Sequence, residues 1–154
     1  MRGKRHSVDS RFRLQVFLLQ IEPIARVVNG VTGYVDDWSG IESKLVLEKE
    51  FAPGLFRLGQ HGHIWVLYGF HRVRGWKERV HPRHDPKRRV VGVFASRSPK
   101  RPNRIGLTLV ELISVRGNIV RVRGLDALDG SPVFDIKPYV AEMDENREHA
   151  RKNR

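Results

Sequence analysis

Residues 92–107 read Gly-Val-Phe-Ala-Ser-Arg-Ser-Pro-Lys-Arg-Pro-Asn-Arg-Ile-Gly-Leu. One apolar run, 90–95, leads into this stretch, and a second, 105–110, leads out of it. Between them, Pro99 and Pro102 disfavour a helix, because proline lacks an amide hydrogen and restricts the residue before it. We therefore expect a core strand over 90–95, an extended loop, and a second strand. The loop carries four cations and suits an anionic partner: Arg97, Lys100, Arg101 and Arg104.

The positive charge of the chain is concentrated around this loop. The net charge is +12, and residues 72–104 contain 12 basic and 2 acidic side chains, whereas residues 105–154 contain 8 of each. Such clustering is typical of a surface that binds the phosphates of a nucleic acid. The candidates for RNA contact are the cations in and before the loop: Lys87, Arg88, Arg89, Lys100, Arg101 and Arg104.

Composition limits the remaining possibilities. A chain of 154 residues with 40% hydrophobic and 30% charged residues is typical of one globular domain. The absence of cysteine excludes disulfides, thiolate catalysis and cysteine-based zinc sites. No run approaches the roughly 20 apolar residues of a membrane span, and the basic start lacks the features of a secretory signal. We expect a cytoplasmic protein without a membrane partner.

Strand-like segments continue on both sides of the central stretch. Residues 61–71 form a nearly continuous apolar run, which predicts a strand buried on both faces, with Trp65 in the core. Residues 41–51 alternate as in a half-buried strand, and 53–58 suit a short helical turn. The polar segment 72–89 predicts a surface excursion. Near the start, 14–28 predicts one or two strands interrupted at Pro23.

Downstream, 105–115 and 118–122 predict a hairpin turning at Gly117, and 133–140 predicts the last strand. The fold class that follows is all-β, or mainly β: a single β-barrel domain over 13–140 with short helical segments. We expect residues 1–12 to be a mobile basic tail and 141–154 to be a polar C-terminal helix or tail, since that segment has no apolar stripe.

Two motifs in this order, 92–107 and Leu125-Asp-Ala-Leu-Asp-Gly-Ser-Pro-Val-Phe-Asp-Ile-Lys-Pro-Tyr139, resemble those of the TsaA-like (TrmO) family. The segment 21–25 adds weaker support. The resemblance implies an S-adenosylmethionine-dependent methyltransferase on a β-barrel. It implies methylation of the exocyclic nitrogen of threonylcarbamoyladenosine in tRNA, and a homodimer. Two positions depart from the family pattern: Arg104 replaces a proline, and the loop 29–40 replaces a Pro-Arg-Gln segment.

By position, the resemblance implies that S-adenosyl-L-methionine is bound by seven residues: His71, Arg72, Arg97, Leu107, Leu125, Asp126 and Ala127. Arg97 or Arg72 suits the cofactor carboxylate, because a guanidinium forms paired charged hydrogen bonds. Asp126 suits the ribose hydroxyls or the ammonium group. Structural readings remain open: His71 as the boundary of a strand, and Asp126 as the brace of a turn.

Asp135, Lys137 and Tyr139 are the candidate catalytic residues for handling the acceptor's proton, and alternation places them on one face of a strand. The alternative is an Asp135–Lys137 ion pair that braces the barrel. His61 and His63 lie on one face of a strand, but no third metal ligand is evident, so we expect a structural role. Trp76 suits either stacking on a base or a partly covered surface position.

Three functional hypotheses follow. The first is a tRNA methyltransferase that uses S-adenosylmethionine. The second is a non-catalytic RNA-binding β-barrel in which the basic segment holds phosphates. The third is a methyltransferase that acts on another, small substrate. Cofactor binding separates the first from the second, and salt dependence of substrate binding separates the first from the third.

Overall fold

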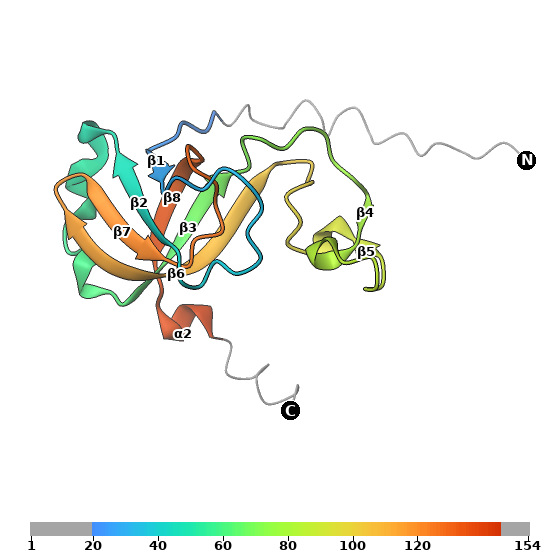
Figure 1. Cartoon of the computed structure of the whole chain (residues 1–154). Helices are drawn as coiled ribbons and strands as arrows, with labels where there is room; N and C mark the ends of the chain where they lie inside the picture. Colours follow the sequence, from blue (N-terminus) through green and yellow to red (C-terminus); the bar gives the residue numbers. More distant parts are fainter. Residues whose placement is uncertain (1–19, 146–154) are drawn as a thin grey trace, which may run out of the picture.

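The computed structural model describes residues 20–145, and six antiparallel strands in it close into a barrel in the order β1-β2-β7-β6-β3-β8 (Figure 1). The mainly β barrel predicted from the sequence is confirmed. The barrel strands are β1 (Ala25–Val28), β2 (Glu42–Leu47), β3 (His63–Gly69), β6 (Ile105–Arg116), β7 (Ile119–Arg123) and β8 (Pro132–Pro138).

Alternating side chains on these strands fill the barrel. In β3, Ile64, Val66 and Tyr68 are buried, and they meet buried residues from the other strands, among them Val27, Leu45, Val110, Val120 and Val133. The opposite face of β3 is only half-buried. The prediction of a strand buried on both faces was therefore wrong, and Trp65 lies on the outer face rather than in the core.

The hairpin of β6 and β7 turns at Gly117, which has a φ of +58°. Glycine adopts this left-handed conformation without steric cost, so the predicted turn is confirmed. β6 is 12 residues long and pairs with both β3 and β7. Its first residues, from Ile105, carry the chain out of the basic segment and into the barrel.

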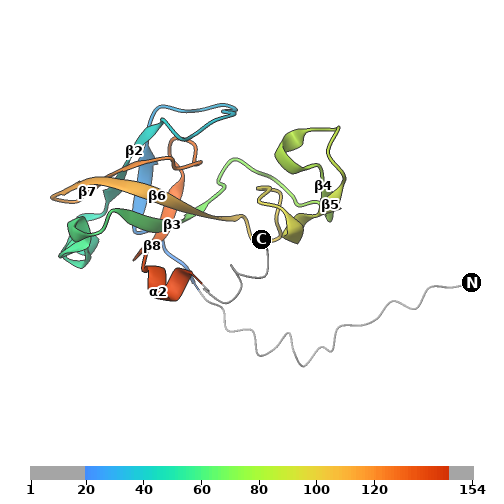
Figure 2. The same cartoon turned by 90° about the horizontal axis from the view of Figure 1, so that it is seen from below.

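Residues 72–104 stand beside the barrel (Figure 2). They contain a two-stranded sheet, β4 (Arg79–Val80) with β5 (Val91–Gly92), and two short 3-10 helices, η3 (Pro82–His84) and η4 (Val93–Ala95). The surface excursion is thus confirmed, but the core strand predicted over 90–95 was wrong. Its strand ends at Gly92, because the carbonyl of Val93 closes a turn with the amide and hydroxyl of Ser96.

The remaining elements flank the barrel. β2 ends at Leu47, and the helical turn begins earlier than predicted, as η1 (Lys49–Leu55), followed by η2 (Leu58–Gln60). The described part of the C-terminal segment holds one helical turn, α2 (Ala141–Asp144). The predicted tail 1–12 and the end of the C-terminal segment lie outside the described residues. Within residues 20–145, no helix is both long and apolar enough to cross a membrane.

Candidate active-site cleft

A cleft of about 820 Å³ lies between the barrel and the basic excursion. One wall is the loop after β1, the other is the excursion, and Asp126 lies at the end of the barrel. Six cations line the cleft: Lys77, Arg79, Arg83, Arg88, Arg97 and Lys100. Aromatic and polar side chains also line it, among them Tyr34, Asp36, Trp38, His81, Ser96 and Ser98. This volume lies within the usual range of small-molecule sites.

Three polar side chains meet where the barrel opens into the cleft. The hydroxyl of Tyr68 donates a hydrogen bond to Oδ1 of Asp126 at 2.7 Å, and the Thr108 hydroxyl donates to the same oxygen. Tyr68 and Thr108 come from neighbouring strands, β3 and β6, whereas Asp126 follows β7. Within residues 20–145, the second carboxylate oxygen of Asp126 accepts no protein hydrogen bond. The site therefore presents an oriented carboxylate to the cleft.

The Tyr68 hydroxyl serves as a donor in this arrangement. Burial, and then the negative charge of Asp126, raise the pKa of Tyr68 far above its ordinary value of 10.0. Both causes disfavour the phenolate, so the proton stays on Tyr68 and is available to the carboxylate. The Asp126 carboxylate faces the cationic excursion across the cleft, and Arg97 lies near enough to Tyr68 to influence its pKa.

His71 and Arg72 lie beside the turn after Asp126 rather than among the residues that line the cleft. His71 Nδ1 lies 3.2 Å from the Ser131 hydroxyl, and Arg72 Nε donates to His71 Nε2 at 3.3 Å. Arg72 also donates to the carbonyl of Thr32 at 2.9 Å. Partial burial, and then the charge of Arg72, lower the pKa of His71. The neutral ring therefore ties β3 to the loop and the turn.

The turn itself is held by Asp129. Its Oδ1 accepts from the amides of Asn29 and Gly30 at 2.8 and 2.9 Å, and these bonds lower the pKa of Asp129. Gly130 follows with a φ of +80°, a left-handed conformation that glycine adopts at a turn without steric cost. Asp126 does not brace this turn, because its Oδ1 is engaged by Tyr68 and Thr108. The structure thus gives the two aspartates separate contacts.

The other predicted cofactor contacts differ in exposure. Leu125 and Ala127 are buried in the barrel core, so their side chains anchor the segment and only their backbone groups remain for a ligand. Leu107 is 50% exposed on the outer face of β6, where its cross-strand partner is Leu67. The structure brings Arg97 and Asp126 to the cleft and leaves Leu107 on a different face of the strand.

The predicted RNA contacts divide in the same way. Arg88 and Lys100 line the cleft, and Lys87 and Arg89 are exposed beside it. Arg101 Nη1 donates to the carbonyls of Val93 and Ser96 at 3.1 and 2.7 Å, and Arg104 Nη1 donates to that of Val73 at 2.7 Å. The Nη1 groups of these two arginines therefore stabilise the conformation of the loop.

Asp135, Lys137 and Tyr139 do not line the cleft. Asp135 and Lys137 form an ion pair of 2.8 Å on β8, as the structural alternative predicted. They pair in register with Leu67 and Trp65, so they belong to the outer face of the barrel. Tyr139 lies just after β8, and its hydroxyl donates to Glu145. The catalytic role of the three residues stays a prediction.

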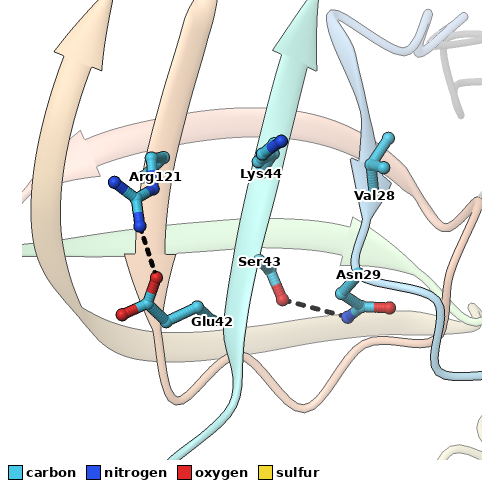
Figure 3. Close-up of a pocket in the computed structure, with 6 residues that line it drawn as sticks. All are labelled: Val28, Asn29, Glu42, Ser43, Lys44 and Arg121. Carbon is cyan, nitrogen blue, oxygen red and sulfur yellow. Dashed lines mark hydrogen bonds and ion pairs between the residues drawn. The ribbon is translucent and has the colours of Figure 1, made fainter.

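A second, smaller pocket of about 260 Å³ opens on the barrel wall (Figure 3). In it, Asn29 donates to the Ser43 hydroxyl at 2.9 Å, and Arg121 forms an ion pair with Glu42 at 2.6 Å. Asn29 also donates to the carbonyl of Ala127 and accepts from the amide of Val31, so this pocket braces the loop after β1. Among residues 20–145, no cluster of three or more His, Asp or Glu side chains is arranged to hold a metal ion.

Local sequence patterns do not mark several residues as part of the site. Tyr68 and Thr108 lie inside apolar runs and look like packing residues, although period-two alternation places Thr108 on the inner face with Gly106 and Val110. Tyr34 and Trp38 lie in a loop whose path across the cleft no local pattern indicates.

Fold and site together define a β-barrel domain with a carboxylate at one end and a cationic wall facing it. The chain belongs to the family of tRNA-methyltransferase O N-terminal domains, whose model matches residues 35–145. A probable S-adenosyl-L-methionine-binding protein of Methanothermobacter thermautotrophicus is 49% identical over 107 residues, covering 70% of this chain and 76% of the relative. One of Pyrococcus abyssi is 45% identical over 105 residues, covering 68% of this chain and 55% of the relative.

Two further similarities connect the chain to named enzymes and to a solved structure. The tRNA (adenine(37)-N6)-methyltransferase of Mus musculus is 45% identical over 92 residues, which are 58% of this chain and 21% of that protein. The crystal structure of TrmO from Pseudomonas aeruginosa aligns with a TM-score of 0.67 at 28% identity, covering 84% of this chain and 59% of that one. The chain thus spans about three fifths of that solved structure and a fifth of the mouse enzyme.

Proposed function

We propose that this chain is a methyltransferase that uses S-adenosyl-L-methionine and acts on tRNA, and that its acceptor is the exocyclic N6 of threonylcarbamoyladenosine. The observation that carries the proposal is the cleft, which joins the Asp126 carboxylate to a cationic wall inside the segment that matches the family. The names of the archaeal relatives and of the mouse enzyme support the cofactor and the substrate.

The side chains of the cleft fit the cofactor. The Oδ2 atom of Asp126, which accepts no hydrogen bond from residues 20–145, suits an ammonium group or ribose hydroxyls, and Arg97 suits a carboxylate. The backbone of Leu125 and Ala127 is held rigid by buried side chains, as a site for a planar base requires. S-adenosylmethionine supplies an activated methyl group when bound, and the task of the protein is then to hold and orient the two reactants.

The cationic wall supports RNA as the partner. Arg79, Arg83 and Arg88 lie along the cleft, whose lining holds six lysines and arginines against two carboxylates, and this excess of positive charge suits phosphate oxygens. Arg88 also forms an exposed ion pair with Asp85 at 3.5 Å. Tyr34 is 75% exposed at the same cleft, and its hydroxyl is held by Asp36 at 3.2 Å, so its ring is available to stack on a base. The threonine carboxylate of threonylcarbamoyladenosine adds a negative charge that this wall suits.

We also propose that the protein is a cytoplasmic homodimer. Leu107 and Leu109 are exposed on the outer face of β6, and their cross-strand partners on β3 are the half-buried Leu67 and Trp65. A second copy that covered this apolar surface would remove it from water. Equilibrium sedimentation tests the dimer, and Leu107→Glu should shift the protein to a monomer.

Calorimetric titration with S-adenosylmethionine tests the cofactor. We expect binding by the wild type, loss of binding in Arg97→Ala, and unchanged binding in Arg116→Ala, since Arg116 is at the far end of β6. The second assay compares methyl transfer to tRNA with and without the threonylcarbamoyl group. RNA binding without cofactor binding would instead establish the non-catalytic RNA-binding barrel. Transfer to a small acceptor but not to tRNA would establish the third hypothesis.

A further inference from the structure

One carboxylate oxygen of the exposed Asp126 side chain is held by two hydroxyls that the predicted cofactor contacts do not include. Tyr68 is only 1% exposed, yet its hydroxyl reaches the barrel opening and lies 2.7 Å from Oδ1 of Asp126. The Thr108 hydroxyl donates to the same oxygen from the neighbouring strand. Two donors from two strands on one carboxylate oxygen fix both the position and the rotation of the group.

We propose that Thr108 and Tyr68 are positioning residues, which hold Asp126 with Oδ1 toward the barrel and Oδ2 toward the cofactor in the cleft. This inference rests on the proposed function. A carboxylate already fixed in its binding orientation loses less conformational freedom when the ligand arrives, and affinity increases accordingly. Both hydroxyls act through Asp126.

The surroundings explain why the arrangement keeps one orientation. The Tyr68 ring packs edge-on against Phe70 with centroids 5.3 Å apart, and it lies directly over the backbone of Gly106. Thr108 is held in register, since it pairs with Val66 in the ladder of β3 and β6. Both donors therefore belong to the rigid barrel, whereas Asp126 follows a strand end. The rigid strands β3 and β6 therefore fix the orientation of the Asp126 carboxylate.

A double-mutant cycle on cofactor affinity tests the inference. The variant Tyr68→Phe/Thr108→Val removes both hydroxyls and leaves the shapes nearly unchanged. We expect its calorimetric dissociation constant for S-adenosylmethionine to rise about tenfold, as loss of two modest hydrogen bonds predicts. In an Asp126→Ala background, which has no side-chain acceptor for either hydroxyl, the same two changes should alter the constant less than about twofold, because their effect passes through the carboxylate.

Two controls separate positioning from general damage. Thr108→Ser keeps the hydroxyl and should bind as the wild type does. Val120→Ala removes a fully buried side chain on β7, so it should lower the melting temperature without changing the dissociation constant. Wild-type affinity in the double variant would overturn the inference, and so would an equal loss in both backgrounds.

A ligand-free measurement keeps this inference distinct from the proposed function. Three-bond NMR couplings between the α and β protons of Asp126 report its χ1 rotamer. We expect one rotamer in the wild type and averaged couplings in Tyr68→Phe/Thr108→Val. Equal couplings in the two proteins would overturn the positioning role. If the wild type does not bind S-adenosylmethionine, the proposed function and the cofactor-directed role of Asp126 both fail, whatever the couplings show.

Discussion

The ring of Tyr68 lies over the backbone of Gly106, so close that a Cβ atom at residue 106 would approach the ring atoms Cε2 and Cε1 to 2.7 and 2.8 Å. The two residues are cross-strand partners in β3 and β6. Gly106 belongs to the Arg-Ile-Gly part of the central stretch, and its lack of a side chain is what allows the Tyr68 hydroxyl to reach Asp126. Close packing against the Tyr68 ring thus explains why residue 106 of the motif is a glycine.

Gly106→Ala should therefore destabilise the protein, although alanine is otherwise better suited to a strand than glycine. The added methyl group meets a buried ring that has no free space, and overpacking of this kind costs about 1–3 kcal/mol. Urea unfolding measures the change. Gly59→Ala is the matched control, because its nearest neighbour would be Val115 Cγ2 at 3.9 Å, an ordinary contact. Equal stability of the two variants would contradict this account of Gly106.

Removal of a cation from the cleft wall should weaken RNA binding in a salt-dependent manner. For Arg79→Ala or Lys100→Ala, we expect the slope of log affinity against log salt concentration to become shallower by about 0.7–0.9 for each phosphate that the protein no longer neutralises. Fluorescence anisotropy at several salt concentrations gives the slope. Arg116→Ala is the control, because Arg116 ends β6 about 36 Å along the strand from Ile105. A slope that changes only in the control would place the RNA elsewhere.

Tyr34→Ala should raise the KM for tRNA and leave the dissociation constant of the cofactor unchanged. An aromatic ring that stacks on a base contributes about 1–3 kcal/mol, so KM should rise roughly 5- to 150-fold. Tyr34→Phe keeps the ring and should retain most of the wild-type value. A weaker cofactor affinity in Tyr34→Ala would instead show that the ring contacts the cofactor.

Protonation of His71 should occur below the ordinary pKa of 6.5, because partial burial and the charge of Arg72 disfavour the charged ring. In the neutral ring, Nε2 accepts from Arg72, and protonation removes this bond. The stability that His71 contributes is thus present above pH 6.5 and is lost as the pH falls through the lowered pKa. NMR titration of the ring measures the pKa, and a value at or above 6.5 would contradict the contact.

The barrel could be predicted from the sequence because its signals are local. Alternation along 41–51 and a hairpin turn at Gly117 marked strands that the structure has at Glu42–Leu47, Ile105–Arg116 and Ile119–Arg123. The segment 90–95 misled the prediction, because an apolar run looks the same in a core strand and in a side sheet. What decided its position was its partner, Arg79–Val80, which lies in a polar region without any strand pattern. Pairing of this kind depends on contacts between segments distant in the sequence, and the periodicity within a single segment does not show it.

The candidate site was predictable only in part. Arg97 and Asp126 came from the family resemblance, and the structure places both at the cleft. Thr108 and Tyr68 were missed, since a hydroxyl in an apolar run has no signal until its partner is known. Tyr34 was missed because a loop of 13 residues between β1 and β2 has no pattern that tells where it crosses.

The two walls of the cleft differ in how firmly they are built. The barrel closes on itself through six strands, whereas the excursion has its own sheet of only two short strands. Few backbone hydrogen bonds join it to the barrel side, such as those from the amide of Val73 to the carbonyl of Phe70 and from the amide of Phe70 to the carbonyl of Arg104. Segments with so few hydrogen bonds and buried contacts open at low free-energy cost. In evolution, such a wall can lengthen, shorten or change charge without refolding of the domain. In the proposed function, the carboxylate for the cofactor therefore belongs to the firmly built barrel, and the cations for the RNA belong to the loosely held excursion.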